Sequence, residues 1–131
     1  MLLGLTEVQG TGIIITLTDN IEAKFTSEEL MDLINELNSA GAEAISINDQ
    51  RIVSMSDIFD VGEFIMINGK RVTSPYIIKA IGDSMYLQSA LSIKNGYLDK
   101  YKTDGYTISM TTDNNVTINK YEGEMTLNYV K

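Results

Sequence analysis

The stretch TSEELMDLINELNSAGAEAISI, residues 26–47, decides the fold class, because it predicts a helix followed at once by a strand. Thr26, with Glu29 three residues later, is a capping box, a pattern that begins many helices. Leucine and isoleucine then recur at helical spacing, and Gly41 is a typical residue just past a helix C-terminus. We therefore predict a helix over about residues 27–40.

The residues after this helix alternate with the two-residue period of a strand. One side of that strand carries Ala42, Ala44 and Ser46, and the other carries Ile45 and Ile47. Small side chains allow another element to approach closely. We therefore expect the helix to pack against the side with the small residues.

Further strands are predicted by short apolar or β-branched runs that are bounded by turn residues. The runs are Gly12–Thr18, Arg51–Met55, Phe64–Ile67, Lys70–Thr73, Tyr76–Ile81, Tyr106–Met110 and Asn115–Asn119. Asn68-Gly69 is the strongest hairpin signal, because a type I′ turn needs positive φ at both central positions. Asn48-Asp49-Gln50 predicts another tight turn, and Pro75 is expected at the start of a strand. The last two runs are expected to form a hairpin across Asp113-Asn114.

A second helix is predicted to begin at Gly82-Asp83-Ser84, and a short third helix is predicted near Tyr97 and Tyr101. The inner face of the second helix should carry Leu87, Ala90 and Leu91. Strands and helices do not alternate strictly, so the class is α+β. We expect a single domain with a mixed β-sheet and two or three helices packed mainly on one face. Its predicted limits are an N-terminal arm at 1–9, the domain at 10–121 and a C-terminal tail at 122–131.

Composition excludes several classes of function. The chain has 131 residues, which fits one domain, and a formal net charge of −8. Such an acidic domain is unsuited to nucleic acid or anionic lipid, and the charge by itself favours solubility. Histidine and cysteine are absent, which removes the commonest general base, the thiolate nucleophile and zinc–thiolate sites. We expect no cofactor and no metal. No apolar run approaches the roughly 20 residues that span a bilayer.

Catalytic patterns are weak. Gly82-Asp83-Ser84-Met85 resembles the opening of one esterase family, but that mechanism needs a histidine, so a helix N-cap at Asp83 or Ser84 is preferred. Gln9-Gly10-Thr11-Gly12 precedes a strand and is interpreted as a bend into the sheet. A serine–lysine dyad of Ser46 or Ser54 with Lys79 has no supporting spacing. A carboxylate pair drawn from Asp19, Glu36 and Glu43 leaves a histidine-free hydrolase as the third hypothesis.

One group of polar residues lies on or beside elements that otherwise look buried. Its members, together with Lys79, are the candidate binding residues: Asn35, Glu43, Asn48, Gln50, Arg51 and Lys79. Arg51 and Glu43 are expected to form a charge-assisted pair between neighbouring strands. Two interpretations remain open. The group is either a hydrogen-bonded network that braces a hairpin or a small polar pocket.

Four segments resemble one bacterial family: Gly10–Asp19, Asn35–Leu37, Ala40–Ile52 and Pro75–Asp83. The family is domain of unknown function 881, whose members are often labelled YlxX- or YlxW-like division initiation proteins. The resemblance covers most of residues 4–121. It implies a membrane anchor and a short coiled coil before the domain in a longer protein, a location outside the cytoplasmic membrane, and no established enzymatic activity. At Phe25-Thr26 the chain lacks the acidic or histidine-containing stretch of many members, which argues against a metal role there.

Two functions from different classes follow. The first is a non-catalytic extracytoplasmic domain of a membrane-anchored bacterial protein, which binds a protein partner in cell division or cell-envelope assembly. An exposed apolar or tyrosine-rich patch would favour it. The alternative is a small-ligand-binding sensor domain with a polar pocket around Asn48 and Arg51. Convergence of these two residues with Glu43 and Lys79 in one concave pocket would favour that alternative.

Overall fold

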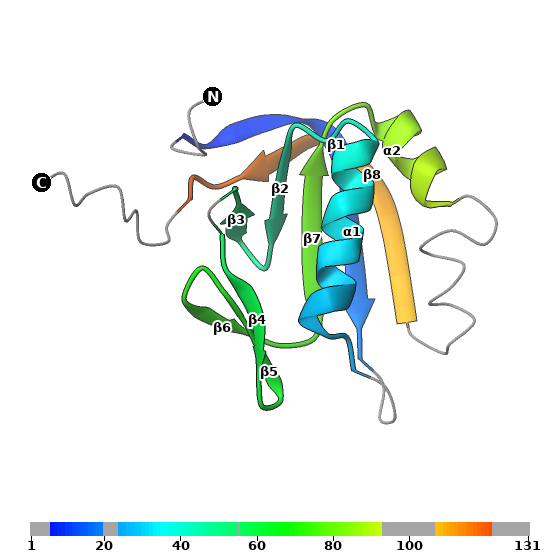
Figure 1. Ribbon diagram of the computed structural model, residues 1–131. Helices are drawn as coiled ribbons and strands as arrows, with labels where there is room; N and C mark the ends of the chain where they lie inside the picture. The colour runs from blue at the N-terminus through cyan, green and yellow to red at the C-terminus, as the bar shows by residue number, and fades with distance from the viewer. Residues whose placement is uncertain (1–5, 20–23, 55, 93–106, 122–131) are drawn as a thin grey trace, which may run out of the picture.

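The fold is seen in a computed structural model that describes residues 6–19, 24–54, 56–92 and 107–121 (Figure 1). Its strands are β1 Val8–Thr18, β2 Ala44–Ile47, β3 Gln50–Ile52, β4 Ile58–Val61, β5 Phe64–Ile67, β6 Lys70–Val72, β7 Tyr76–Ile81 and β8 Thr107–Ile118, and its helices are α1 Ser27–Ser39 and α2 Ser84–Leu91. Both of these helices pack into the core on one face of the larger sheet. The predicted α+β class, with helices on one face, is confirmed.

The strands form two sheets, with the orders β3-β2-β7-β1-β8 and β4-β5-β6. We expected one mixed sheet, but the pairs described in both sheets are antiparallel. Tight turns explain the pairs β2-β3, β4-β5 and β5-β6, because antiparallel neighbours can be joined by two residues whereas parallel ones need a long crossover. The turn at Asn48 and Asp49 joins β2 to β3, with φ of 48° and 69°. The predicted turn there is confirmed.

Helix α1 begins as the sequence predicts. Thr26 Oγ1 accepts a hydrogen bond from the Glu29 backbone N–H at 3.2 Å, and Glu29 Oε1 accepts one from the Thr26 N–H at 2.9 Å. The helix packs, however, against the face that carries Ile45 and Ile47 rather than the small residues. The prediction about the packing face is therefore wrong. The neighbouring strands β1 and β7 direct their own large aliphatic residues to the same face, so the isoleucines complete a continuous apolar surface.

The small-residue side of β2 is covered by strands instead of a helix. Ala44 and Ile81 pack there with Val116 and Ile118, from the end of β8. The start of β1 and the end of β8 run together across this side of the sheet (Figure 1). We call this pair of strand ends, residues 8–10 of β1 and 116–118 of β8, the ribbon. With α1 on the opposite side, the ribbon explains why all four residues of β2 are buried.

Strand β8 is one continuous strand, so the predicted hairpin across Asp113-Asn114 is wrong. The register shifts between Gly10 opposite Val116 and Gly12 opposite Asp113. One extra residue of β8 is accommodated there as a bulge, where the Asn115 N–H donates to Asp113 Oδ1 at 2.8 Å. The turn-forming residues make a bulge because the long strand β1 offers a partner along the whole of β8.

The glycines before Ile13 lie inside β1 and do not form a bend into the sheet. A Cβ built at Gly12 would lie 1.9 Å from the carbonyl oxygen of Ala80, so β7 approaches too closely for any side chain. β1 begins at Val8, which lies before the predicted domain limit at residue 10. The close contact of two backbones is the reason for glycine here.

The small sheet confirms the hairpin at Asn68-Gly69, where φ is 54° and 80°. β4 was not predicted, and it pairs with β5 across a turn that contains Gly62, with φ of 58°.

The Asp83 N-cap of α2 is confirmed, because Asp83 Oδ1 accepts from the Tyr86 N–H at 3.0 Å. The predicted third helix near Tyr97 and Tyr101 lies outside the described residues.

Candidate functional site

Arg51 connects β3 to the residues that flank the ribbon. Its side chain is buried, with 3% of the residue exposed, and its Nη1 donates to the carbonyl oxygens of Thr6 at 3.0 Å and Asn119 at 3.2 Å. Its own carbonyl oxygen accepts from Asn68 Nδ2 at 2.8 Å. Burial lowers the pKa of Arg51 from its usual value, but an arginine remains charged at physiological pH. The geometry of Arg51 is that of a brace between the chain ends.

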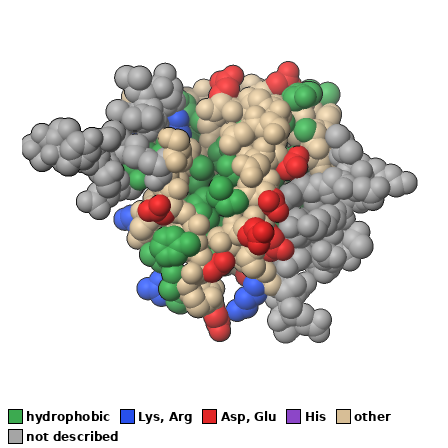
Figure 2. All heavy atoms as spheres, in the orientation of Figure 1, with side chains coloured by type: hydrophobic (Ala, Val, Ile, Leu, Met, Phe, Trp, Pro, Cys, Tyr) green, Lys and Arg blue, Asp and Glu red, His purple; other side chains and the backbone are tan. Residues whose placement is uncertain are grey.

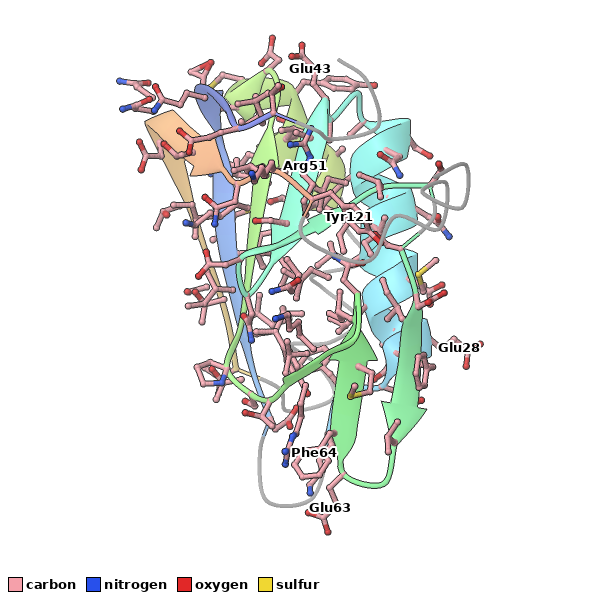
Figure 3. The ribbon with its side chains drawn as sticks, turned by 90° about the vertical axis from the view of Figure 1, so that its left-hand side faces the viewer. Glu28, Glu43, Arg51, Glu63, Phe64 and Tyr121 are labelled. Carbon is pink, nitrogen blue, oxygen red and sulfur yellow. The ribbon has the colours of Figure 1, made fainter. Side chains whose placement is uncertain are left out.

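Glu43 does not reach Arg51. Arg51 is paired with Ser46 in the ladder between β2 and β3, whereas Glu43 lies before β2. Three residues of extended chain separate Glu43 from Ser46 by about 10 Å. Figure 3 shows Glu43 at one end of the molecule and Arg51 further inside. The predicted ion pair between Glu43 and Arg51 is therefore wrong.

Asn48 joins the turn after β2 to the segment that leads into β7. Its Oδ1 accepts from the Ile77 N–H at 2.6 Å. Its Nδ2 lies 3.3 Å from the carbonyl oxygen of Thr73 and 3.4 Å from that of Pro75. Asn48 therefore stabilises the connection between these strands. Nearby, Gln50 Oε1 is buried and has no hydrogen-bond partner in the described part of the chain, which costs stability. Neither side chain lines the hollow between α1 and the strands β2, β3 and β4.

Lys79 lies beside Ser46, although no spacing in the sequence predicted that they would be neighbours. The two residues are paired in the ladder between β2 and β7. Ser46 is only 1% exposed, and Lys79 Nζ lies 3.8 Å from a carboxylate oxygen of Asp49. A serine nucleophile needs an approach path for its substrate, and the burial of Ser46 leaves none. The burial of Ser46 therefore argues against a catalytic dyad with Lys79.

The three carboxylates of the hydrolase hypothesis do not converge. Asp19 follows the end of β1, where its Oδ1 accepts from the Phe25 N–H at 2.8 Å. Glu43 lies at the other end of the sheet, where its N–H donates to the Ile81 carbonyl. Glu36 lies on the exposed side of α1. Among residues 6–19, 24–54, 56–92 and 107–121, no cluster of three or more acidic, histidine or cysteine residues is arranged to hold a metal ion.

A hollow of about 390 Å³ lies between α1 and the strands β2, β3 and β4; we call it the groove. It is lined by Met31, Ile34, Asn35, Asn38, Glu43, Ala44, Ile45, Ile52, Val53, Ser54, Ser56 and Ile58. Figure 2 shows hydrophobic atoms inside the hollow and acidic side chains around it. Of the candidate binding residues, the groove brings together Asn35 and Glu43. The other four lie elsewhere.

A second surface feature was missed by the sequence reasoning. Phe59, Val61 and Phe64 are 48%, 44% and 36% exposed on the outer face of the small sheet. The ladder pairs Val61 with Phe64 and Phe59 with Met66, so their side chains form one face, which we call the apolar face. The alternation of Phe59 and Val61 before Gly62 was the available signal. It was overlooked because no strand was assigned there.

The apolar face is preorganised by a cation–π contact. The guanidinium carbon of Arg71 lies 4.5 Å from the centroid of the Phe64 ring. On the opposite side of the same sheet, Ile65, Ile67 and Val72 are buried in the main core. Figure 3 shows Phe64 and Glu63 at the outer end of this sheet. The sheet is therefore held firmly on one side and presents aromatic and aliphatic groups on the other.

The comparisons with known proteins point to one family. A family model described as "Bacterial protein of unknown function (DUF881)" matches residues 1–131. The chain is 30% identical over 125 residues to UPF0749 protein YlxW of Bacillus subtilis, covering 88% of the chain and 54% of that protein. It is 36% identical over 109 residues to UPF0749 protein Rv1825 of Mycobacterium tuberculosis, covering 80% of the chain and 37% of that protein.

A solved structure shares the fold. It is described as the crystal structure of an uncharacterized conserved protein from Mycobacterium tuberculosis, and it matches with a TM-score of 0.83 and 31% identity. The match covers 95% of this chain and 90% of that chain. The chain spans about half or less of the length of these curated relatives. Within the described residues, no helix has the length and apolar character needed to cross a bilayer.

Proposed function

Because the chain belongs to the DUF881 family of bacterial proteins of unknown function, we propose that it is a non-catalytic domain that binds a protein partner in cell division or cell-envelope assembly. The observation that carries this proposal is the apolar face of the small sheet. Phe59, Val61 and Phe64 are partly exposed there, although the same strands bury Ile65 and Ile67.

Contiguous exposed apolar side chains are a marker of interaction sites, because each exposed group loses the stabilisation that burial would give. Aromatic residues and arginine also dominate the energetics of protein interfaces. Phe64 and Arg71 are already stacked on each other. A partner that covers them has to order few side chains, which lowers the entropic cost of association.

The chemistry of the described residues supports a binding role over catalysis. The chain has no histidine or cysteine, and Asp19, Glu36 and Glu43 lie apart. The small-ligand alternative has less support, because Asn48 and Arg51 are engaged in hydrogen bonds within the fold.

We further propose that the domain lies on the extracytoplasmic side of the membrane as part of a longer anchored protein. This placement rests on the family resemblance in the segments Gly10–Asp19, Ala40–Ile52 and Pro75–Asp83. Alkaline phosphatase and a cytoplasmic reporter, each fused to the end of the longer protein, would test it. Activity of the phosphatase fusion alone is expected. Activity of the cytoplasmic reporter alone would contradict the placement.

A pair of matched double variants tests the binding proposal. Phe59→Ser with Phe64→Ser removes the apolar face, and Met85→Ser with Tyr86→Ser removes apolar groups on α2 that are more exposed, at 71% and 59%. Each protein is used to capture crosslinked partners from the source bacterium, with quantification against wild type. We expect the first variant to lose a partner that the second retains. Equal capture by all three proteins would contradict the proposal.

A further inference from the structure

The groove is a second surface with a distinct chemistry. Its floor is apolar: Ile34 and Ile45 are 4% and 3% exposed, and Ile52 and Ile58 pack against the same core. Met31 stands at its edge, 40% exposed. The volume of about 390 Å³ lies at the lower end of the range of pockets that hold ligands. This space fits a few side chains and is too small for a folded domain.

Polar groups border this apolar floor. Asn35 and Asn38 come from successive turns of α1, and Ser54 and Ser56 come from the segment between β3 and β4. Side-chain amides can both donate to and accept from a peptide backbone. None of the hydrogen bonds described within the fold uses the side-chain amides of Asn35 and Asn38, and both residues are exposed. The groove therefore offers hydrogen-bonding groups on the helix side and apolar contacts beneath.

The charge around the groove has a single sign. Glu43 lines it, no lysine or arginine does, and Asp32 and Glu36 are exposed on α1 beside its lining residues. Asp57, also exposed, lies between two lining residues of the opposite wall. Figure 2 shows acidic side chains on both sides of the hollow. Several carboxylates at the edge of a concave surface raise the local concentration of cations and favour basic ligands.

From the apolar floor and the acidic edge together, we propose that the groove binds a short peptide segment of a protein partner, with one or two apolar residues flanked by lysine or arginine. The apolar residues fill the floor between Ile34 and Ile45, and a basic residue lies near Glu43. The proposal rests on the proposed function and adds the chemistry of a second contact. The groove is separate from the apolar face, because Ile58 faces the core and its neighbour Phe59 faces outward.

Binding of labelled synthetic peptides to the full chain tests this proposal. The probe alternates leucine with lysine; one control alternates serine with lysine, and another alternates leucine with glutamate. We expect saturable binding of the leucine–lysine peptide by fluorescence anisotropy and at least about tenfold weaker binding of both controls, since each lacks one of the two complementary features. Equal binding of the serine–lysine peptide would overturn the proposal, because the apolar floor would then contribute nothing.

Matched variants locate the site. Glu43→Lys reverses a charge in the groove, and Glu7→Lys makes the same change at an exposed position outside it. Both side chains are exposed, so both variants are expected to fold, which a thermal melt checks. We expect Glu43→Lys to weaken binding about tenfold and Glu7→Lys to weaken it less than about threefold. Equal effects would show attraction to net charge alone and would overturn the groove assignment.

The double variant at Phe59 and Phe64 separates this proposal from the proposed function. It should bind the leucine–lysine peptide as wild type does, because the groove is unchanged. Loss of peptide binding in that variant, with normal binding by Glu43→Lys, would place the peptide on the apolar face and overturn the groove proposal. Failure of every peptide to bind would also overturn the groove proposal. It would leave the proposed function standing, because partner binding through the apolar face is tested separately by the capture experiment with the two double variants.

Discussion

Arg51 and Asn119 lie 68 residues apart in the sequence and are joined by a 3.2 Å hydrogen bond from the guanidinium Nη1 to the backbone carbonyl oxygen. The same Nη1 also donates to the carbonyl of Thr6 at 3.0 Å. One buried side chain thus ties the edge strand β3 to the residues that flank the ribbon. Through these two hydrogen bonds, the backbone at Thr6 and at Asn119 is held against β3.

Arg51→Ala should lower the free energy of unfolding by about 2–4 kcal/mol, because it leaves buried acceptors without a donor and opens a cavity. Arg71→Ala, which removes an exposed guanidinium stacked on Phe64, is the matched control and should cost less than about 1 kcal/mol. Urea unfolding of both variants measures the difference. Equal losses would contradict the bracing role of Arg51.

Gly12→Ala should destabilise the domain by more than about 3 kcal/mol or prevent folding, because its Cβ would overlap the Ala80 carbonyl oxygen at 1.9 Å. Gly69→Ala is the control. Gly69 has a φ of 80° and no atom within 4 Å of an added Cβ, so the substitution should cost only about 1 kcal/mol of backbone strain. Thermal melts rank the two variants. A Gly12→Ala protein as stable as Gly69→Ala would disprove the close contact of β1 with β7.

Stability should fall between pH 10 and 12 because of Tyr76. Burial first, and the charges of Asp19 and Asp60 second, raise the pKa of Tyr76 from 10.0 to about 12. The stabilisation by the neutral phenol is fully present below pH 10 and is lost as the pH rises through 12, a loss of about 2–3 kcal/mol. Urea unfolding across this range should show a smaller decrease for Tyr76→Phe than for wild type. Tyr86→Phe, at an exposed position, should leave the decrease unchanged.

Asn48 contributes through both its backbone and its side chain. Its φ is 48°, and its Oδ1 accepts from Ile77 at 2.6 Å. Asn48→Gly keeps the backbone freedom and loses the hydrogen bonds, so it should cost about 1–2 kcal/mol. Asn48→Ala loses the hydrogen bonds and also strains the backbone at positive φ, so it should cost about 1 kcal/mol more than Asn48→Gly. Chemical denaturation compares the two, and identical costs would show that the positive φ carries no energetic penalty.

Local signals in the sequence predicted the elements that depend on short-range chemistry. The capping box at Thr26 and Glu29, the turns at Asn48-Asp49 and Asn68-Gly69, and the N-cap at Asp83 each depend on a few adjacent residues. The interactions that form these features involve residues only a few positions apart in the chain. The α+β class followed from the order of these elements.

Features that depend on distant partners were predicted poorly. Asp113-Asn114 is turn-forming by composition, but the long strand β1 selects a bulge instead. The packing face of β2 depends on which residues β1 and β7 present beside it. Among the candidate site residues, Glu43 and Arg51 looked complementary by charge, but the ladder register sets their separation. None of these outcomes can be derived from a local pattern, because each is decided by pairing between segments far apart in the chain.

The most direct test of partner binding through the apolar face is site-specific photo-crosslinking in the source bacterium. A photoreactive phenylalanine replaces Phe64 in the longer protein in one strain and Ser89, an exposed position on α2, in another. We predict a discrete crosslinked partner from position 64 that is absent from position 89 and disappears when Phe59→Ser is added. The same adducts from both positions, or none from position 64, would contradict binding through this face.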